Sequence, residues 1–271
     1  MQITGLFIYP IKSMGGISLK NATVLPRGLQ YDRRWMLVDE NHRFISQRQH
    51  RELALLRCNI QEDQLMVSHS KKDLQPLAIP LQPGQKHSYI EVEIWNDRFN
   101  ALHLDSDYSD WFEQVLGREC KLVYMPERNE PEKGTIRYYK NGEAVSFADS
   151  CPLLVVGEAS VADFNKRLDK PVKAANFRPN ILVSTTLPYE EESWKAFKLG
   201  EVSFKGIRTC GRCQIIGFDQ DKATNDPAVL KTLASYRKKD NKVLFGWYAS
   251  LNSNLGKKNI IRVGDEVELN D

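Results

Sequence analysis

Hydrophobic residues recur in short runs, or alternate with polar residues, along most of this chain, and Gly, Pro, Asn or Asp bounds many of the runs. Such a pattern predicts many short strands joined by turns. Up to residue 125 the expected strands are Leu6–Ser13 (stopped by Pro10), Ile17–Val24, Tyr31–Val38, Leu53–Ile60, Gln64–Ser68, Tyr89–Trp95, Arg98–Leu104 and Cys120–Met125. Beyond it they are Leu153–Val156, Ile181–Val183, Val202–Ile207, Gln214–Asp219, Leu244–Tyr248, Ile260–Ile261 and a last strand entered through Val263–Val267.

Three stretches have features of an amphipathic helix. The first is Ser109–Gly117, with its first residue as N-cap and its glycine as the end. The second is Glu158–Leu168, and the third begins with Asp226 as N-cap and Pro227 at the first helical position. Because strands outnumber helices, we predict a mainly β (α+β) fold with β-barrel-like architecture and a few packed helices. A doubly wound sheet is not expected, since no Gly-x-Gly-x-x-Gly follows a strand and there is no P-loop.

The length of 271 residues is enough for one large or two small domains. We place the boundary near residue 120, so that residues 1–120 form an N-terminal domain and residues 121–271 a second one. Of the connections, Ser70–Ser88 is expected to be a surface loop and Asn96–Asp97 a hairpin turn. Pro126–Gly142 is polar, which predicts a linker or a mobile loop.

Composition excludes several classes of protein. A net charge of +3 is too small to imply nucleic-acid binding, although a basic pocket for an anionic ligand remains possible. The N-terminus lacks a basic segment followed by a long apolar run, and no run is long enough to span a bilayer. Five cysteines, an odd number with three of them isolated, favour a reducing compartment over a secreted disulfide framework, so a cytoplasmic location is expected.

The strongest chemical signal is Cys210–Gly211–Arg212–Cys213, predicted to lie on a tight turn between two strands. The flanking Arg208 and Arg212 favour the thiolate form of both cysteines, and thiolate is the form that binds metals. Four explanations are open at this point. The pair is a disulfide or structural turn, a redox dithiol, half of a zinc site, or the source of a single thiolate ligand for a soft metal that a cofactor holds.

Several other segments carry groups that suit an anion. Lys12 and Ser13 follow a strand on a glycine-rich loop, and one arginine of the segment after Tyr31 is a candidate inward-facing clamp. Arg178 precedes a proline and is therefore expected to be extended, which would aim its guanidinium. Ser146–Pro152 leads into a buried strand and is a candidate pocket lining. The five histidines form no metal-ligand pattern.

These segments together resemble the MOSC family, and within it the branch of the mitochondrial amidoxime-reducing component and its bacterial relatives. The resemblance runs nearly end to end. It is carried by Ile8–Ser13, Asp32–Trp35, Phe147–Asp149, Glu158–Ser160, Asn176–Asn180, Cys210–Cys213, Leu230–Leu233, Phe245–Gly246 and Val263–Asp265. It implies an N-terminal MOSC-type β-barrel region followed by a MOSC β-barrel, with a molybdenum–molybdopterin cofactor between them.

The resemblance also implies roles for individual residues. Cys213 corresponds to the metal ligand, and Asp149 is a candidate proton relay. The remaining cofactor-binding positions are Lys12, Ser13, Arg33, Ser150, Arg178, Asn180, Gly211, Arg212 and Tyr248. Two departures from the family pattern are Gly211, where a serine is usual, and the segment Asp219–Ala223, which replaces an Asp-Pro-Asp-Thr-Gly turn.

The activity that the resemblance implies is reduction of N-hydroxylated compounds, such as amidoximes or hydroxylamino bases, by two-electron cleavage of the N–O bond. Electrons would come from a separate protein, either ferredoxin-like, cytochrome b5-like or a flavin reductase. No iron–sulfur cluster motif is present in this chain. The alternative is a molybdenum cofactor carrier or sulfur-transfer module without its own turnover, and a third possibility is a β-barrel protein whose cysteine pair is only structural.

Overall fold

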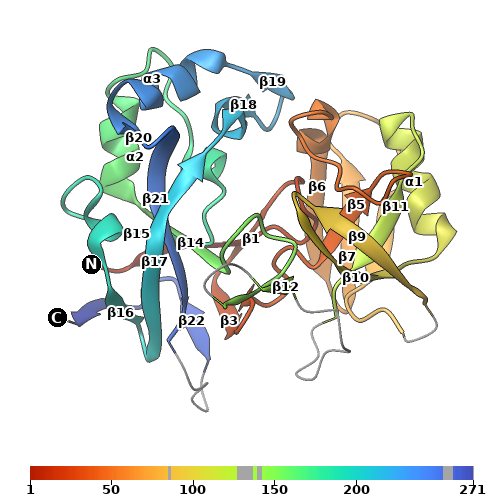
Figure 1. Ribbon diagram of the computed structural model, residues 1–271, viewed down its shortest axis with the longest axis horizontal. Coiled ribbons are helices and arrows are strands. Elements are labelled where there is room, and N and C mark those ends of the chain that lie inside the picture. Colours follow the sequence, from red (N-terminus) through yellow and green to blue (C-terminus); the bar gives the residue numbers. More distant parts are fainter. Residues whose placement is uncertain (85–86, 127–136, 139–141, 253–258, 271) are drawn as a thin grey trace.

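The computed structural model describes residues 1–84, 87–126, 137–138, 142–252 and 259–270. Two groups of strands lie side by side in it, one built mainly from residues 35–124 and the other mainly from residues 153–270 (Figure 1). The first strand of the chain lies between them in this view. Within the described residues, every helix is too short or too polar to cross a bilayer.

The largest sheet collects strands from both ends of the chain. In order across the sheet they are β2 (Ile17–Leu19), β1 (Ile3–Ile8), β15 (Ile181–Val183), β14 (Leu153–Gly157), β21 (Lys242–Leu251), β17 (Val202–Arg212), β16 (Ala196–Leu199) and β23 (Val267–Asn270), and β20 (Lys238–Lys239) pairs with β21. β1 is antiparallel to β15, whereas β14 and β15 are parallel to each other. The segment after β1 is thereby brought next to the segments that precede β14 and β15.

Smaller sheets form the rest of the described β structure. One has the order β5 (Trp35–Val38), β11 (Lys121–Tyr124), β10 (Asp97–His103), β9 (Tyr89–Ile94), and another the order β6 (Leu56–Gln61), β7 (Gln64–His69), β8 (Leu77–Pro80). A third joins β22 (Ile260–Arg262), β3 (Asn21–Leu25) and β4 (Gly28–Leu29). Two-stranded pairs are β12 (Arg137–Tyr138) with β13 (Ala144–Val145), and β18 (Phe218–Asp219) with β19 (Thr224–Asn225).

The helices are few. The α-helices are α1 (Ser106–Leu116), α2 (Glu158–Asn165) and α3 (Pro227–Arg237), and the 3₁₀ turns are η1 (Arg51–Leu55), η2 (Ala174–Phe177), η3 (Glu190–Ser193) and η4 (Gln214–Gly217). At the start of α3 the Asp226 carboxylate accepts the Ala228 N–H at 2.9 Å, as the sequence predicted. The mainly β fold with a few helices is confirmed, and the described strand pairings form open sheets rather than closed rings.

Several local predictions were wrong. Asp105, not Ser109, is the N-cap of α1, and Ser109 is buried inside that helix, where its hydroxyl accepts the Leu122 N–H. The hairpin turn is Trp95–Asn96, because Ile94 pairs with Asp97. β8 lies within the segment expected to be only a loop, and the segment expected as one strand from Ile17 is divided between β2 and β3. Most of the expected linker from Pro126 lies outside the described residues.

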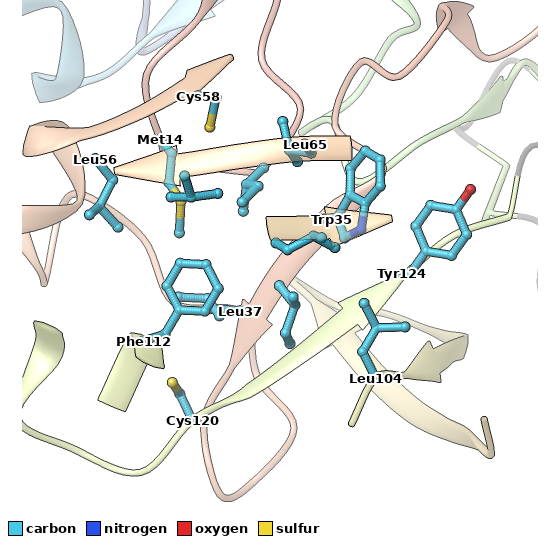
Figure 2. Close-up of a cluster of buried hydrophobic side chains, with 14 of the residues drawn as sticks. Met14, Trp35, Leu37, Leu56, Cys58, Leu65, Leu104, Phe112, Cys120 and Tyr124 are labelled. Atoms are coloured by element: carbon cyan, nitrogen blue, oxygen red, sulfur yellow. The ribbon is translucent and has the colours of Figure 1, made fainter. Parts of the chain in front are cut away.

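One hydrophobic core fills the first group of strands (Figure 2). Trp35 and Leu37 of β5 are fully buried and lie across from Phe112 of α1 and Leu65 of β7. The Trp35 ring centroid is 4.9 Å from that of Tyr124. All four residues of β5 are buried: Trp35 and Leu37 belong to this core, and Met36 and Val38 to a separate cluster on the other face. β5 begins at Trp35, immediately after the charged residues Asp32–Arg34.

A second core joins residues that are far apart in sequence. Side chains from β1, β3 and β4 pack with side chains from β14 to β17, and the buried members include Leu6, Val24, Val155, Phe197 and Phe204. Residues 3–29 therefore share a core with residues 153–267. The domain boundary near residue 120 stays a prediction. The structure shows in addition that the first strands of the chain pack into the core of the second group of strands.

A buried carboxylate secures the corner between β14 and α2. Glu191 is fully buried, and its Oε1 accepts the Gly157 N–H at 3.0 Å and the Ser160 hydroxyl at 2.9 Å. Burial raises the pKa of Glu191 above its ordinary value, and these hydrogen bonds only partly offset that effect. The folded protein consequently holds the Glu191 proton to a higher pH than the unfolded chain does.

Glu191→Gln is expected to change the pH dependence of stability. The folded-state pKa is raised, so the wild-type protein loses stability as pH rises above the unfolded-state pKa, and glutamine removes this loss. Urea unfolding between about pH 4 and pH 7 should show the free energy of unfolding of the variant rising relative to wild type. A difference that stays constant, or falls, over this range would contradict the assignment.

Candidate functional site

A cleft of about 120 Å³ lies where the loop after β1, the segment before β14 and the end of β17 meet. All the residues singled out from the sequence line it: Lys12, Ser13, Arg33, Asp149, Ser150, Arg178, Asn180, Gly211, Arg212, Cys213 and Tyr248. Cys151, from the segment expected to line a pocket, lines it too. Three further lining residues, Phe44, Gln47 and Arg48, were not selected from the sequence. They come from an irregular segment after β5 that carries no recognisable motif, so only the folded structure identifies them.

The cysteine motif differs from the predicted turn between two strands. β17 continues through Arg212, Cys213 follows its end with extended backbone, and η4 begins at Gln214. A shift in pairing with β21 between Thr209 and Gly211 distorts the strand just before this end. Ladder hydrogen bonds to β21 therefore hold the motif, which gives it a more rigid frame than a free turn.

The state of the cysteines bears on the explanations of the cysteine pair. All five cysteines are free, and Cys213 is the one that is partly exposed while the other four are buried. Within the described residues, no three His, Cys, Asp or Glu side chains gather as a metal site, which removes support for zinc. Cys151 also lines the cleft, but burial raises its thiol pKa to about 11, so it is protonated at neutral pH.

Arg212 is fixed beside Cys213. Its Nη1 donates to Cys210 Sγ at 2.9 Å and its Nη2 to the Phe177 carbonyl at 2.7 Å. Its Nε is buried without a hydrogen-bond partner. Burial alone would lower the pKa of Arg212, yet the nearby Cys210 and Tyr248 groups raise it, so the guanidinium stays charged. Cys210 is therefore a buried sulfur that orients a cation.

Two arginines crowd around one buried tyrosine. The Arg33 and Arg178 guanidinium carbons lie 4.4 and 4.2 Å from the Tyr9 ring centroid. Burial, and then repulsion from Arg33, lowers the pKa of Arg178 to about 10. Asp32, itself fully buried, offsets part of this charge through an oxygen 2.5 Å from Arg33 Nη1. The Tyr9 hydroxyl has no hydrogen-bond partner, and burial raises its pKa to about 12.

Arg178 is not extended as the following proline predicted. Its φ and ψ are 54° and 48°, the left-handed region, because its N–H closes η2 on the Ala175 carbonyl. The side chain then reaches back to the first half of the chain, where Nη1 donates to the Met14 carbonyl at 2.7 Å. Ser13 and Arg33 also have positive φ, at 69° and 51°. Three strained positions line one cleft, a pattern common at functional sites.

Lys12 and Asp149 form an ion pair across the cleft. Lys12 Nζ lies 2.5 Å from Asp149 Oδ1 and also donates to the Phe147 carbonyl at 2.8 Å. Surrounding protein alone would raise the pKa of Asp149, but the Lys12 ammonium holds it well below its usual range. Burial lowers the pKa of Lys12, although the carboxylate opposes this. At neutral pH Asp149 is thus ionised and has no proton to donate, while burial makes the Lys12 ammonium a better proton donor than an exposed lysine.

The remaining predicted residues divide into two kinds. Arg208 Nη2 donates to the Ser150 hydroxyl at 3.1 Å and its guanidinium lies 5.0 Å from the Tyr248 ring centroid, so these three form one wall. Asn180 is instead used by the strands, since its amide accepts the Leu154 N–H and donates to the Phe7 carbonyl. A Cβ at Gly211 would approach nothing closer than 3.8 Å, so the fold itself does not require glycine there.

Positive charge dominates the cleft. Five cationic side chains line it, against one carboxylate among the described lining residues: Lys12, Arg33, Arg48, Arg178 and Arg212 against Asp149. Such an excess, with unpaired Arg212 Nε and with three cations partly or fully buried, suits a multiply charged anion. Cys213 supplies a soft ligand at the same place. A phosphate-bearing, sulfur-ligated metal cofactor fits this donor set.

Comparisons with known proteins decide the family. Residues 1–119 match the MOSC N-terminal beta barrel domain, and residues 142–268 match the MOSC domain. Mitochondrial amidoxime-reducing component 1 of Mus musculus is 31% identical over an alignment that covers 98% of this chain and 82% of that protein. The chain belongs to the MOSC family. Its sequence-based assignment is confirmed.

Two other relatives of this MOSC chain carry the names of two different kinds of protein, an amidoxime-reducing component and a molybdenum cofactor sulfurase. Mitochondrial amidoxime-reducing component 1 of Homo sapiens is 28% identical, with 98% of this chain and 82% of the relative covered. Molybdenum cofactor sulfurase of Oryza sativa subsp. japonica is 31% identical, and the alignment covers 91% of this chain but 32% of the sulfurase. The chain thus spans about a third of the sulfurase and most of the amidoxime-reducing components.

Asp149→Asn is expected to lower the pKa of Lys12 further. The buried ammonium would lose the carboxylate that opposes its desolvation, so the neutral amine becomes more favourable. An NMR titration of the Lys12 Cε resonance in wild type and variant measures this. Asp221→Asn, which removes an exposed carboxylate paired with Arg57, is the matched control and should leave the Lys12 titration unchanged. An unchanged Lys12 pKa in Asp149→Asn would contradict the ion pair.

Proposed function

We propose that this chain is a molybdenum-cofactor-dependent oxidoreductase that reduces N-hydroxylated compounds by cleaving the N–O bond. The observation that carries the proposal is the partly exposed Cys213 at the edge of a cleft lined by five cations. The likeness to amidoxime-reducing components over 98% of the chain supports the reaction class. Reduction of an amidoxime consumes two electrons and two protons and releases an amidine and water.

The side chains of the cleft would share the binding of the cofactor. Cys213 would ligate the metal through its thiolate. Lys12, Arg33, Arg178 and Arg212 would bind the anionic phosphate and pterin groups, with Ser13, Ser150, Gly211 and Tyr248 beside them. Asn180 would act mainly by holding Leu154 and Phe7 in place. The bound cofactor would supply the two-electron chemistry.

Proton delivery is proposed for the ion pair rather than for Asp149 alone. Asp149 is held ionised by Lys12 and is therefore a weak base, so its part in the pair would be to hold and orient the Lys12 ammonium. Lys12, whose pKa burial lowers, would be the group that donates. Both groups line the cleft, and the hydrogen bond from Lys12 Nζ to the Phe147 carbonyl would hold the ammonium in position there.

An external electron donor is part of the proposal, either ferredoxin-like, cytochrome b5-like or a flavin reductase. All five cysteines are free, which supports a reducing compartment such as the cytoplasm. The likeness to molybdenum cofactor sulfurase supports a second candidate, a cofactor carrier or sulfur-transfer module without turnover of N-hydroxylated compounds. The two differ in whether cofactor-loaded protein reduces benzamidoxime with a reduced dye as electron source.

Cys213→Ser tests the proposal. The serine hydroxyl is a poor ligand for a sulfur-bound metal, so we expect the benzamidoxime reduction rate, with reduced methyl viologen, to fall by about 100-fold or more. Molybdenum content should fall as well. Cys151→Ala is the matched control, because this protonated thiol lines the same cleft and should be dispensable. Undiminished activity in Cys213→Ser would refute the assignment, and wild-type protein that holds molybdenum but reduces nothing would favour the carrier.

A further inference from the structure

A pair of aromatic side chains, Phe44 and Trp95, lies where the cleft adjoins a second groove, and neither belongs to the proposed cofactor-binding residues. Phe44 and Arg48 line the main cleft and also an adjoining groove, which Trp95 lines as well. The Phe44 and Trp95 ring centroids are 5.0 Å apart at 63°, and the Arg48 guanidinium lies 4.3 Å from the Trp95 ring centroid. We call Phe44, Arg48 and Trp95 the aromatic shelf.

Trp95 occupies a position where tryptophan is unfavourable for the fold. It is the first residue of the two-residue turn between β9 and β10, and its φ is 58°. Glycine is the usual residue at such a position, because a side chain with positive φ is strained. The indole is also 45% exposed. A large aromatic group kept exposed on a strained turn beside a cleft points to binding rather than to packing.

The shelf is held in place by hydrogen bonds. The Phe44 N–H donates to the Glu93 carbonyl at 3.2 Å, and the Glu93 N–H donates to the His42 carbonyl at 2.9 Å. These bonds tie the segment of Phe44 to β9, the strand that leads into Trp95. The turn that carries Arg48 is closed by the Gln49 and His50 N–H groups on the Ser46 carbonyl. These backbone hydrogen bonds fix the relative positions of the segments that carry Phe44, Arg48 and Trp95.

The shelf reaches the proposed reaction centre through short contacts. Lys12 Nζ lies 5.1 Å from the Phe44 ring centroid, and the same Nζ is paired with Asp149. Arg48 is close enough to lower the pKa of Asp149. A small molecule whose reacting oxygen faced the Lys12–Asp149 pair would thus have its remaining atoms beside Phe44 and Trp95.

The chemistry of the shelf selects the ligand. An indole face and a guanidinium plane both favour flat π systems. The carboxylate of Glu93 is already paired with Arg98 at 3.1 Å, while Arg48 repels cations. We propose that Trp95 is a specificity-determining residue that binds the neutral, planar aromatic or heteroaromatic part of the N-hydroxylated substrate. The inference rests on the proposed function and names the substrate class for that site.

Two amidoximes that share the reacting group test it. With reduced methyl viologen as electron source, the steady-state rates of benzamidoxime and acetamidoxime reduction are compared in wild type, Trp95→Gly and Trp95→Phe. Glycine removes the ring and relieves the positive φ, so this variant is expected to fold. We expect Trp95→Gly to raise KM for benzamidoxime about tenfold and to change kcat less than about twofold. The effect on acetamidoxime should be below about twofold, and Trp95→Phe should restore most of the benzamidoxime affinity.

Leu187→Ala is the matched control, since Leu187 is 64% exposed and lines neither groove, and it should change neither substrate's kcat/KM. Equal losses for both substrates in Trp95→Gly, or no loss for either, would overturn the proposal. The proposal would also be overturned if Trp95→Gly lowered only the rate measured with a protein electron donor, because Trp95 would then contact that donor protein and not the substrate.

Saturation-transfer NMR with benzamide separates a failure of this inference from a failure of the proposed function. Benzamide is planar, neutral and not an N-hydroxylated substrate, so its binding does not depend on turnover. We expect a signal with wild type that is lost in Trp95→Gly and is absent for acetamide. If wild type reduces neither amidoxime, the proposed function fails, but benzamide binding still shows whether the aromatic shelf binds a planar aromatic group. Equal benzamide binding to wild type and Trp95→Gly would overturn the proposal that Trp95 binds the aromatic part of the substrate.

Discussion

Repulsion between buried cations is the constraint on which the rest of this structure depends. Arg33 and Arg178 share the Tyr9 ring at 4.4 and 4.2 Å, and burial together with this neighbour lowers the pKa of Arg178 to about 10. Folding alone gains nothing from gathering such charges. An anion bound in the cleft would explain the crowding. Its attraction to the cations would offset the free-energy cost of bringing them together.

The sheet topology makes this gathering possible. Lys12 and Arg33 follow β1 and precede β5, Arg178 precedes β15, and Arg212 ends β17. Because β1 pairs with β15 in the sheet that also holds β17, segments from opposite ends of the chain meet at one place. The same sheet holds Cys213 rigidly beside them. A soft metal ligand and a cluster of positive charges therefore lie at one cleft, which is what the proposed cofactor would require.

Some of this was predictable from the sequence and some was not. Short alternating runs predicted most strands, and Asp226–Pro227 predicted the start of α3 because capping is a local property. The cleft residues were found through short motifs, and the structure brings all of them together, although their roles remain predictions. Tertiary contacts decided what local sequence could not. Arg178 is left-handed because it closes η2, and β17 continues through the cysteine motif because β21 pairs with it. Trp95 lies against Phe44 because the segment of Phe44 is tied to β9.

The molybdenum content of protein freshly isolated from a host that makes the cofactor tests the central claim most directly. The account predicts stoichiometric molybdenum that stays with the folded chain at low salt and is released more readily as salt screens the cation cluster. Protein that folds normally in such a host and carries no molybdenum under any of these conditions would contradict it.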